Sequence, residues 1–265
     1  MRYPRTLFLA ASFLAASPAL AQTCTILSDA ETGRILVQQG PCDTRNSPAS
    51  TFKVPLAVMG FDFGILQNSQ VPAWPYRAEY RAWNDAWKRA IDPQAWLRDS
   101  VVWYSQELTR RLGMERFQRY VDAFGYGNRD LSGDPGRNNG LTHAWLGSSL
   151  TISPLEEVAF MRRLVRDELP VSKDAQAKTR AAMPEFSTSD GWRVRGKTGS
   201  GFGRGSGGKP DRTKPFGWFV GWAEKEGRTV VFARLIKSDV RVKDYLGPRT
   251  RDGLLEDWPA LVPAR

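Results

Sequence analysis

The sequence is poor in the side chains that most often hold metals or act as bases at neutral pH. It contains one histidine, His143, and two cysteines, Cys24 and Cys42, in 265 residues. These are too few soft ligands for a structural metal site, so we expect none. A Ser-His-Asp triad would have to use His143. It lies in the segment G-L-T-H-A-W, which has no catalytic motif, and we interpret it as an ordinary loop histidine. An acyl-transfer enzyme built from this chain would therefore need another base.

Long apolar runs are also missing, apart from one short run near the start. Leu7 to Ala16 is apolar, follows the basic segment M-R-Y-P-R and precedes Pro18-Ala19-Leu20-Ala21. This pattern is typical of a secretory signal peptide, because the run is shorter than the about 20 residues of a membrane-spanning helix. An uncleaved anchor is the alternative. We expect residues 1–21 to be removed and residues 22–265 to remain as one exported domain without a membrane span.

Export bears on the two cysteines, which both lie near the expected mature N-terminus. The segment between them reads as two strands around a turn at Glu31-Thr32-Gly33, and such a hairpin could bring the two sulfurs together. Because exported proteins can keep disulfides, we expect a Cys24–Cys42 bond, with free thiols as the alternative.

The net charge is +10, or +8 without Arg2 and Arg5. Lysines and arginines are scattered along the chain instead of forming a continuous basic run. For an exported protein this favours solubility and loose attraction to anions over nucleic-acid binding, and we expect no nucleic-acid partner.

Strand patterns occur at both ends of the chain and helical patterns in the middle. We therefore expect an α+β fold, in which the ends pair into one central antiparallel sheet flanked by helices and the middle forms an inserted all-helical region. Ser47 and Pro48 predict a helix start, and Asp99 is expected to cap a helix that begins with Ser100 and ends at Gly113. The Gly-rich stretch from Ser200 to Pro215 is expected to be a long hairpin loop. Helices are expected over 47–59, 99–113, 114–124, 153–166, 174–183 and 249–261, and strands over 25–39, 192–199, 216–223 and 228–237.

One candidate catalytic pair is Ser50 and Lys53, in the segment P-A-S-T-F-K-V-P. Residues three apart share a helix face, and a serine hydroxyl becomes nucleophilic when a neighbouring base takes its proton. Lysine can be that base only when it is neutral, and burial beside Phe52 and Val54 would lower its pKa. A lone S-x-x-K occurs by chance in many chains, and a surface serine with an extended lysine is the alternative.

Two further motifs follow at suitable distances. Ser100-Val101-Val102 precedes a helical pattern, and Lys197-Thr198-Gly199 lies on a predicted strand. S-x-x-K, a second serine motif and K-T-G form the set of penicillin-recognising enzymes. Lys197 and Thr198 can meet a substrate carboxylate, and Ser100 can pass a proton to a leaving nitrogen.

With these motifs the chain resembles the class D, oxacillinase-type serine β-lactamases. The resemblance covers the whole expected mature chain, and it implies the fold shared by penicillin-recognising β-lactamases and transpeptidases. It implies β-lactam substrates and a location in the periplasm. It rests on S-T-F-K (50–53), S-V-V (100–102), Y-G-N (126–128), A-W-L-G-S-S-L-x-I-S-P (144–154), K-T-G (197–199) and F-G-W-F-V-G-W (216–222).

The resemblance also implies roles for single residues. Ser50 would be acylated, and Lys53 would be the general base as an N6-carboxylysine formed with carbon dioxide or bicarbonate, without any other cofactor. Trp145 would hold that carbamate through its indole N–H, beside the apolar Val102 and Leu146, and Ser100 would shuttle a proton. Substrate contacts would come from Val102, Leu146, Lys197, Thr198, Gly199, Ser200 and Arg249, with Arg251 as the rival of Arg249.

Three other functions use the same motifs. A penicillin-binding transpeptidase or carboxypeptidase shares the fold and nucleophile, but its second motif usually ends in asparagine where this chain has Val102. A β-lactam sensor domain would need transmembrane helices and a signalling region. A basic envelope-binding module with vestigial motifs is disfavoured by the complete catalytic set.

Overall fold

The computed structural model describes residues 22–205 and 209–262. The signal-peptide prediction falls on residues 1–21, which lie outside the described residues. Eight α-helices, two short 3-10 helices and six strands occur in the described part of the chain. Within that part, no helix is long and apolar enough to cross a membrane.

One antiparallel sheet with the strand order β2-β1-β6-β5-β4-β3 contains all six strands. Its first two strands come from the N-terminus, and the second of them, β2, pairs with β1, which in turn pairs along its whole length with β6 from the C-terminal third. The strands are β1 (Gln22–Asp29), β2 (Ile35–Gln39), β3 (Glu185–Ser187), β4 (Arg193–Arg204), β5 (Pro210–Lys225) and β6 (Arg228–Lys237). This arrangement confirms the predicted pairing of the two ends of the chain.

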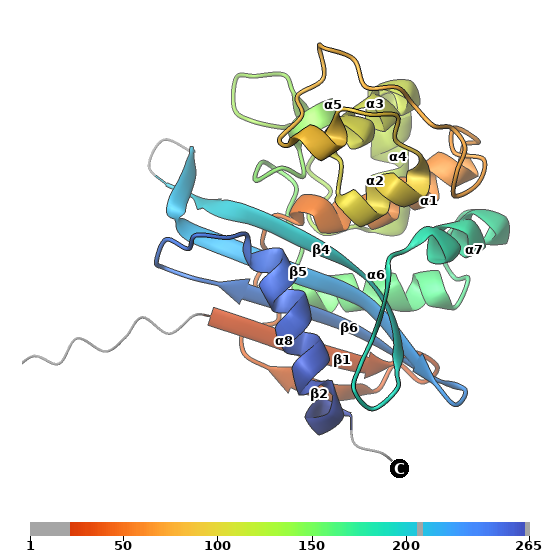
Figure 1. Ribbon diagram of the computed structural model, residues 1–265, viewed down its shortest axis with the longest axis vertical. Coiled ribbons are helices and arrows are strands. Elements are labelled where there is room, and N and C mark those ends of the chain that lie inside the picture. The colour runs from red at the N-terminus through yellow and green to blue at the C-terminus, as the bar shows by residue number, and fades with distance from the viewer. Residues whose placement is uncertain (1–21, 206–208, 263–265) are drawn as a thin grey trace, which may run out of the picture.

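Helices cover both faces of the sheet (Figure 1). On one face lies α8 (Leu246–Leu261), whose Leu254 and Trp258 pack with Val230 and Phe232 in a small apolar core. On the other face α6 (Pro154–Val165) joins a larger core that extends into the helical region. That region is made of η1 (Ala49–Phe52), α1 (Lys53–Asp62), η2 (Asp85–Trp87), α2 (Pro93–Asp99), α3 (Val102–Leu112), α4 (Met114–Phe124), α5 (Gly140–His143) and α7 (Lys173–Ala182). The predicted α+β class with an inserted helical region is confirmed.

Helix ends explain where most elements start and stop. Ser153 and Glu156 form a reciprocal capping box at the start of α6, with Pro154 at the first helical position. Gly113 ends α3 with a positive φ, as predicted. The cap predicted at Asp99 is wrong: Asp99 ends α2, whereas Asp92 caps that helix by accepting a hydrogen bond from the N–H of Ala95 at 2.7 Å.

The long hairpin loop predicted from Ser200 to Pro215 is also wrong. Strand β4 continues to Arg204 and β5 begins at Pro210, with Phe202 paired to Pro215. Glycine in this stretch serves packing, because the space that a Cβ at Gly201 would need is filled by the ring of Phe216. The predicted disulfide is confirmed, since Cys24 of β1 is bonded to Cys42, which follows β2.

Candidate active site

The site begins at the tight turn that carries Ser50. Ser50 lies in η1, which starts with Ala49 at a φ of +49°, and the N–H of Thr51 bonds to the carbonyl of Pro48 at 3.1 Å. Helix α1 begins directly afterwards with Lys53. The Nζ of Lys53 donates a hydrogen bond to the Oγ of Ser50 at 3.0 Å. The structure therefore brings together the two residues of the S-x-x-K motif.

Ser47 does not cap this helix as the sequence suggested, because η1 intervenes. Its hydroxyl donates to the carbonyl of Trp145 at 2.9 Å and accepts from the N–H of Gly147 at 2.9 Å. Ser47 thereby ties the segment before the nucleophile to the segment that contains Trp145.

Lys53 is completely buried. Burial lowers the pKa of Lys53 well below its ordinary value, and the nearby positive charge of Lys197 lowers it further. Within the described residues, no carboxylate acts on the pKa of Lys53 to offset these effects. The neutral amine is the favoured form, and it lies within hydrogen-bond reach of the serine hydroxyl.

Ser100 and Lys197 form a second hydroxyl–amine pair. Ser100 adopts a left-handed conformation, with φ 59° and ψ 37°, between α2 and α3, so the prediction that it opens the central helix is wrong. The Nζ of Lys197 donates to its Oγ at 3.0 Å. Lys197 is 2% exposed, and burial, together with the charge of Arg251, lowers the pKa of Lys197 to about 7. This pair can pass a proton near neutral pH.

Strand β4 brings the K-T-G motif against the nucleophile turn. A Cβ at Gly199 would lie 2.8 Å from the carbonyl oxygen of Pro48, so glycine is needed for this close approach. The hydroxyl of Ser200 accepts from the N–H of Gly247 at 2.9 Å, which fixes the strand to the start of α8. Ser50, Ser100, Thr198 and Ser200 then line one cavity of about 320 Å³.

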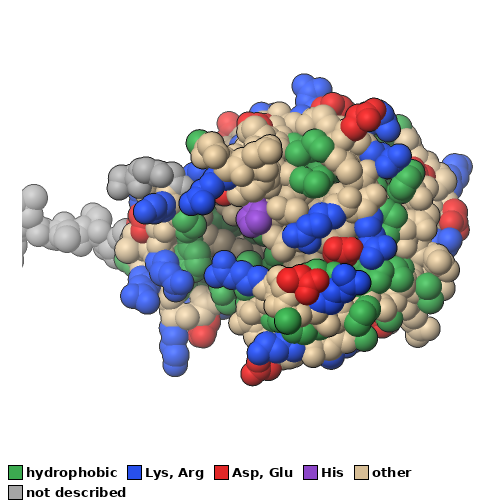
Figure 2. Space-filling model, turned by 90° about the horizontal axis from the view of Figure 1, so that it is seen from above, with side chains coloured by type: hydrophobic (Ala, Val, Ile, Leu, Met, Phe, Trp, Pro, Cys, Tyr) green, Lys and Arg blue, Asp and Glu red, His purple; other side chains and the backbone are tan. Residues whose placement is uncertain are grey.

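A second, wider cavity of about 670 Å³ shares Ser50 and Ser200 and extends toward Leu146 and His143. Figure 2 shows a hollow on this face with the histidine side chain, in purple, on its wall and Lys and Arg side chains at its rim. The hydroxyl of Thr142 contacts the Nδ1 of His143 at 2.8 Å. His143 thus borders the same cavity as Ser50.

Trp145 is fully buried and stacks on Phe52, with ring centroids 5.4 Å apart. Among the described residues, its indole N–H has no hydrogen-bond partner. A buried indole N–H normally finds an acceptor, so this donor is available to a group that the bare side chains do not supply. Val102 is also buried, at the first position of α3.

The two candidate arginines of α8 differ in their surroundings. Arg249 is exposed. Arg251 is partly buried, pairs with Asp252 at 2.7 Å and lines a cavity of about 530 Å³ with Lys197 and Thr198. Arg251 therefore lies beside the K-T-G motif, although we favoured Arg249 from the sequence.

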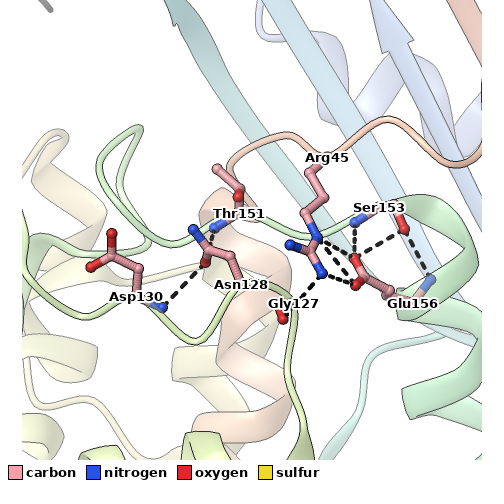
Figure 3. Close-up of polar contacts among 7 residues, drawn as sticks. All are labelled: Arg45, Gly127, Asn128, Asp130, Thr151, Ser153 and Glu156. Atoms are coloured by element: carbon pink, nitrogen blue, oxygen red, sulfur yellow. Dashed lines mark hydrogen bonds and ion pairs between the residues drawn. The ribbon is translucent and has the colours of Figure 1, made fainter.

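Figure 3 shows polar contacts of Asn128, the last residue of the Y-G-N segment. The side-chain oxygen of Asn128 accepts from the N–H of Thr151 at 3.0 Å and from that of Asp130 at 3.3 Å, and its amide nitrogen donates to the carbonyl of Ser149 at 2.8 Å. Asn128 thus holds the end of the segment that begins at Trp145.

Several residues at the site were not anticipated. Trp83 and Tyr245 are both exposed and line both cavities at Ser50. They belong to loops without a periodic pattern, so no sequence signal marks them. Glu157 is buried against Thr51, and here a signal existed: it is four residues before the buried Met161 on the apolar face of α6.

Comparisons with known proteins agree with this geometry. The model of the penicillin-binding protein transpeptidase domain family matches residues 23–249. Beta-lactamase OXA-9 of Klebsiella pneumoniae is 49% identical over 240 residues, which cover 90% of this chain and 88% of that protein. The chain belongs to the class D β-lactamases. Beta-lactamase OXA-1 of Escherichia coli is 36% identical, over 82% of this chain and 76% of that protein.

A solved structure extends the agreement to the fold of this class D β-lactamase. The class D β-lactamase OXA-427 matches with a TM-score of 0.83 at 42% identity, over 91% of this chain and all of that chain. The predicted fold and the predicted enzyme class, a serine β-lactamase and hydrolase, are confirmed. The comparisons support a β-lactamase activity of the class D type.

Proposed function

We propose that the protein hydrolyses β-lactam antibiotics through an acyl-enzyme on Ser50, with Lys53, carboxylated on its Nζ, as the general base in acylation and deacylation. The observation that carries the proposal is the 3.0 Å contact between Ser50 Oγ and a fully buried lysine nitrogen. Only a neutral amine attacks carbon dioxide, and burial favours that form. The carbamate would supply an anionic base, which the chain otherwise lacks beside Ser50.

The surroundings of Lys53 fit such a group. The unpartnered indole N–H of Trp145 is a donor without an acceptor, and a carbamate oxygen is an acceptor. Val102 and Leu146 would provide the apolar surroundings. Carbon dioxide or bicarbonate would then be needed for full activity, and no metal or organic cofactor is part of the proposal.

The remaining residues would bind the substrate and move protons. Lys197, Thr198, Gly199 and Arg249 would bind the carboxylate of the β-lactam, with Arg251 as the rival arginine. The N–H groups of Ser50 and Ser200 would bind the developing oxyanion. Ser100, which accepts a hydrogen bond from Lys197, would pass the proton to the leaving nitrogen.

We further propose that residues 1–21 are a signal peptide and that residues 22–265 act in the periplasm. Edman sequencing of protein from a periplasmic extract should begin at Gln22. An uncleaved Met1 in the membrane fraction would favour an anchor instead.

Hydrolysis of a chromogenic cephalosporin by residues 22–265 tests the mechanism, with bicarbonate present and after its removal. Turnover should fall on removal and recover on addition, and Lys53→Ala should lose at least about a thousandfold in kcat/KM because the base is absent. A single stoichiometric burst without turnover would indicate a penicillin-binding protein that stays acylated. Turnover of Lys53→Ala at the wild-type rate would refute the base assignment.

A further inference from the structure

A carboxyl group lies buried beneath the turn that carries the nucleophile. Glu157 of α6 is completely buried. Its Oε1 is 2.8 Å from the hydroxyl of Thr51 and 2.9 Å from the hydroxyl of Tyr126. The hydroxyl of Thr51 is also 2.9 Å from the carbonyl oxygen of Pro48. Of these three oxygen–oxygen contacts, the one between Glu157 and Thr51 connects α6 to the segment that contains Ser50.

Counting protons across these contacts indicates the state of the carboxyl. Each hydroxyl carries one proton, so Thr51 and Tyr126 together supply two protons for three contacts. With an ionised Glu157, either the contact to Pro48 or the contact to Thr51 lacks a proton. A protonated Glu157 fills all three, because it donates to Thr51, Thr51 donates to Pro48, and Tyr126 donates to Glu157.

The second oxygen of the carboxyl supports the same state. Oε2 of Glu157 is buried and has no hydrogen-bond partner in the part of the chain that the structure describes. An unpartnered oxygen costs less free energy in a neutral acid than in a carboxylate, where it would carry part of a buried charge. Burial raises the pKa of Glu157 to about 7, against the opposing effect of the hydrogen bonds from Thr51 and Tyr126.

The charged and titratable groups around Glu157 offer no counter-ion. On α6, Glu156 raises the pKa of Glu157 and is itself bound to Arg45. Tyr126 follows α4, and burial disfavours the charged form of Lys53 at the start of α1. Arg180 of α7 is bound to Asp167, beyond the end of α6. Strands β1, β5 and β6 contribute buried apolar side chains to the same core, Ile26, Val220 and Ala233 among them.

We propose that Glu157 is a positioning residue that works as the neutral acid, its proton completing a hydrogen-bond chain through Thr51 to the Pro48 carbonyl that fixes the Ser50 turn. The turn also packs against β4, where Gly199 allows the close approach of Pro48. The residues on either side of Ser50 in the chain are thus in contact with a strand, through Pro48, and with a buried acid, through Thr51. The inference rests on the proposed role of Ser50 as nucleophile.

Glu157→Gln is the decisive variant, because glutamine keeps the shape without titrating, and its amide nitrogen, in the place of Oε1, can donate one proton to Thr51 and the other to Tyr126. It should keep kcat/KM within about twofold at pH 6, because each lost hydrogen bond would cost about 1 kcal/mol and none is lost. Thr51→Val should slow acylation of Ser50 about tenfold, because it removes the link to Pro48. Burst kinetics with a penicillin measure that rate.

Two readouts report the proton itself. The infrared difference between wild type and Glu157→Gln at pH 5 should show the C=O stretch of a carboxylic acid. Partial burial would raise the pKa of Glu156, but hydrogen bonds from Arg45 and Ser153 lower it overall. Glu156→Gln is therefore the matched control, and the infrared difference between wild type and this variant should show a carboxylate.

The melting temperature is the second readout, because an unfolded glutamate ionises near pH 4.5 and the buried one near pH 7. Native wild type therefore binds the extra proton, and its Tm should fall relative to Glu157→Gln from pH 5 to pH 8.

A carboxylate band for Glu157 at pH 5 would overturn the proposal. A difference in Tm between wild type and Glu157→Gln that stays constant from pH 5 to pH 8 would overturn it as well. So would a large loss of activity in Glu157→Gln, since it would mean that the charge is needed. Failure of the proposed function is separate: if mass spectrometry finds no acyl group on Ser50, the infrared and melting results still decide the state of Glu157.

Discussion

Two buried lysines lie at the site, and each contacts a serine hydroxyl. Lys53 contacts Ser50 and Lys197 contacts Ser100, at 3.0 Å in both pairs. Each positive charge disfavours another nearby, and burial disfavours both. Converting Lys53 to an anionic carbamate would turn the repulsion between Lys53 and Lys197 into attraction. The proximity of the two lysines would therefore favour both the neutral, reactive amine of Lys53 and the carbamate proposed to form from it.

Trp145→Phe tests the carbamate at the level of one hydrogen bond. Phenylalanine keeps a ring against Phe52 and removes only the indole N–H. Loss of a hydrogen bond to an anion costs about 1.5–3 kcal/mol, so we expect about 10- to 100-fold weaker activation by bicarbonate. Activity titrated with bicarbonate checks this, and excess bicarbonate should restore kcat. Unimpaired activity without bicarbonate would remove Trp145 from the proposed role.

Two arginines compete for the carboxylate of the substrate. From the sequence we expect Arg249→Ala to raise KM for a penicillin about tenfold or more, since a charged hydrogen bond is worth about 1.5–3 kcal/mol, with a smaller effect of Arg251→Ala. Steady-state kinetics of both variants decide. The reverse order would assign the contact to Arg251, which lines a cavity with Lys197 and Thr198.

The catalytic motifs could be predicted from the sequence because each is short and local. Ser50 and Lys53 are neighbours along the chain, so turn and helix geometry alone brings them together. The contact between Lys197 and Ser100 joins residues 97 positions apart, and only the complete set of motifs pointed to it. The buried state of Glu157 depends on Thr51 and Tyr126, which come from two other segments, so helix periodicity alone could indicate burial but not partners.

Elements were predicted well where a local signal decides them and poorly where tertiary contacts do. The helix predicted from residue 153 begins there in the structure, with a capping box at Ser153. The glycines after Gly199 were read as a loop, yet β4 continues because the ring of Phe216 lies over Gly201. Ser100 was read as the first residue of a helix, but its left-handed conformation separates α2 from α3. This departure from the local sequence signal lies at the site itself, where the hydroxyl of Ser100 accepts a hydrogen bond from Lys197.

Ser153→Ala tests the contribution of the α6 cap. The hydroxyl of Ser153 accepts the N–H of Glu156 at 3.3 Å, and loss of such a cap costs about 1 kcal/mol. We expect Tm to fall by about 2–4 °C, as is usual for a protein of this size, with kcat/KM unchanged. Ser238→Ala is the matched control, because its hydroxyl bonds only within an exposed turn. Equal melting temperatures of the two variants would show that the cap contributes nothing.

The N-terminal strands β1 and β2 and the strands β3 to β6 of the C-terminal third form a single sheet. β1 pairs with β6, and the disulfide fixes the segment after β2 to β1. Two strands, β6 and β5, separate β1 from β4, which carries Lys197. We therefore expect the disulfide to stabilise the sheet two strands away from the proposed catalytic groups on β4, and its loss to affect folding and activity differently.

The double variant Cys24→Ser, Cys42→Ser separates these two effects. The bond closes a loop with a sequence separation of 18, and cross-links over loops of this length stabilise by about 3 kcal/mol, mainly by restricting the unfolded chain. The free energy of unfolding in urea should fall by about that amount, while kcat/KM for a chromogenic cephalosporin stays within about twofold below the transition, since the native contacts of Ser50 do not involve the bond. Wild type under reducing conditions should unfold like the variant, which excludes an effect of the serines themselves. If instead activity falls in parallel with stability, β1 and its cross-link must shape the site through β6 and β5, and the sheet would have to be treated as part of the catalytic apparatus.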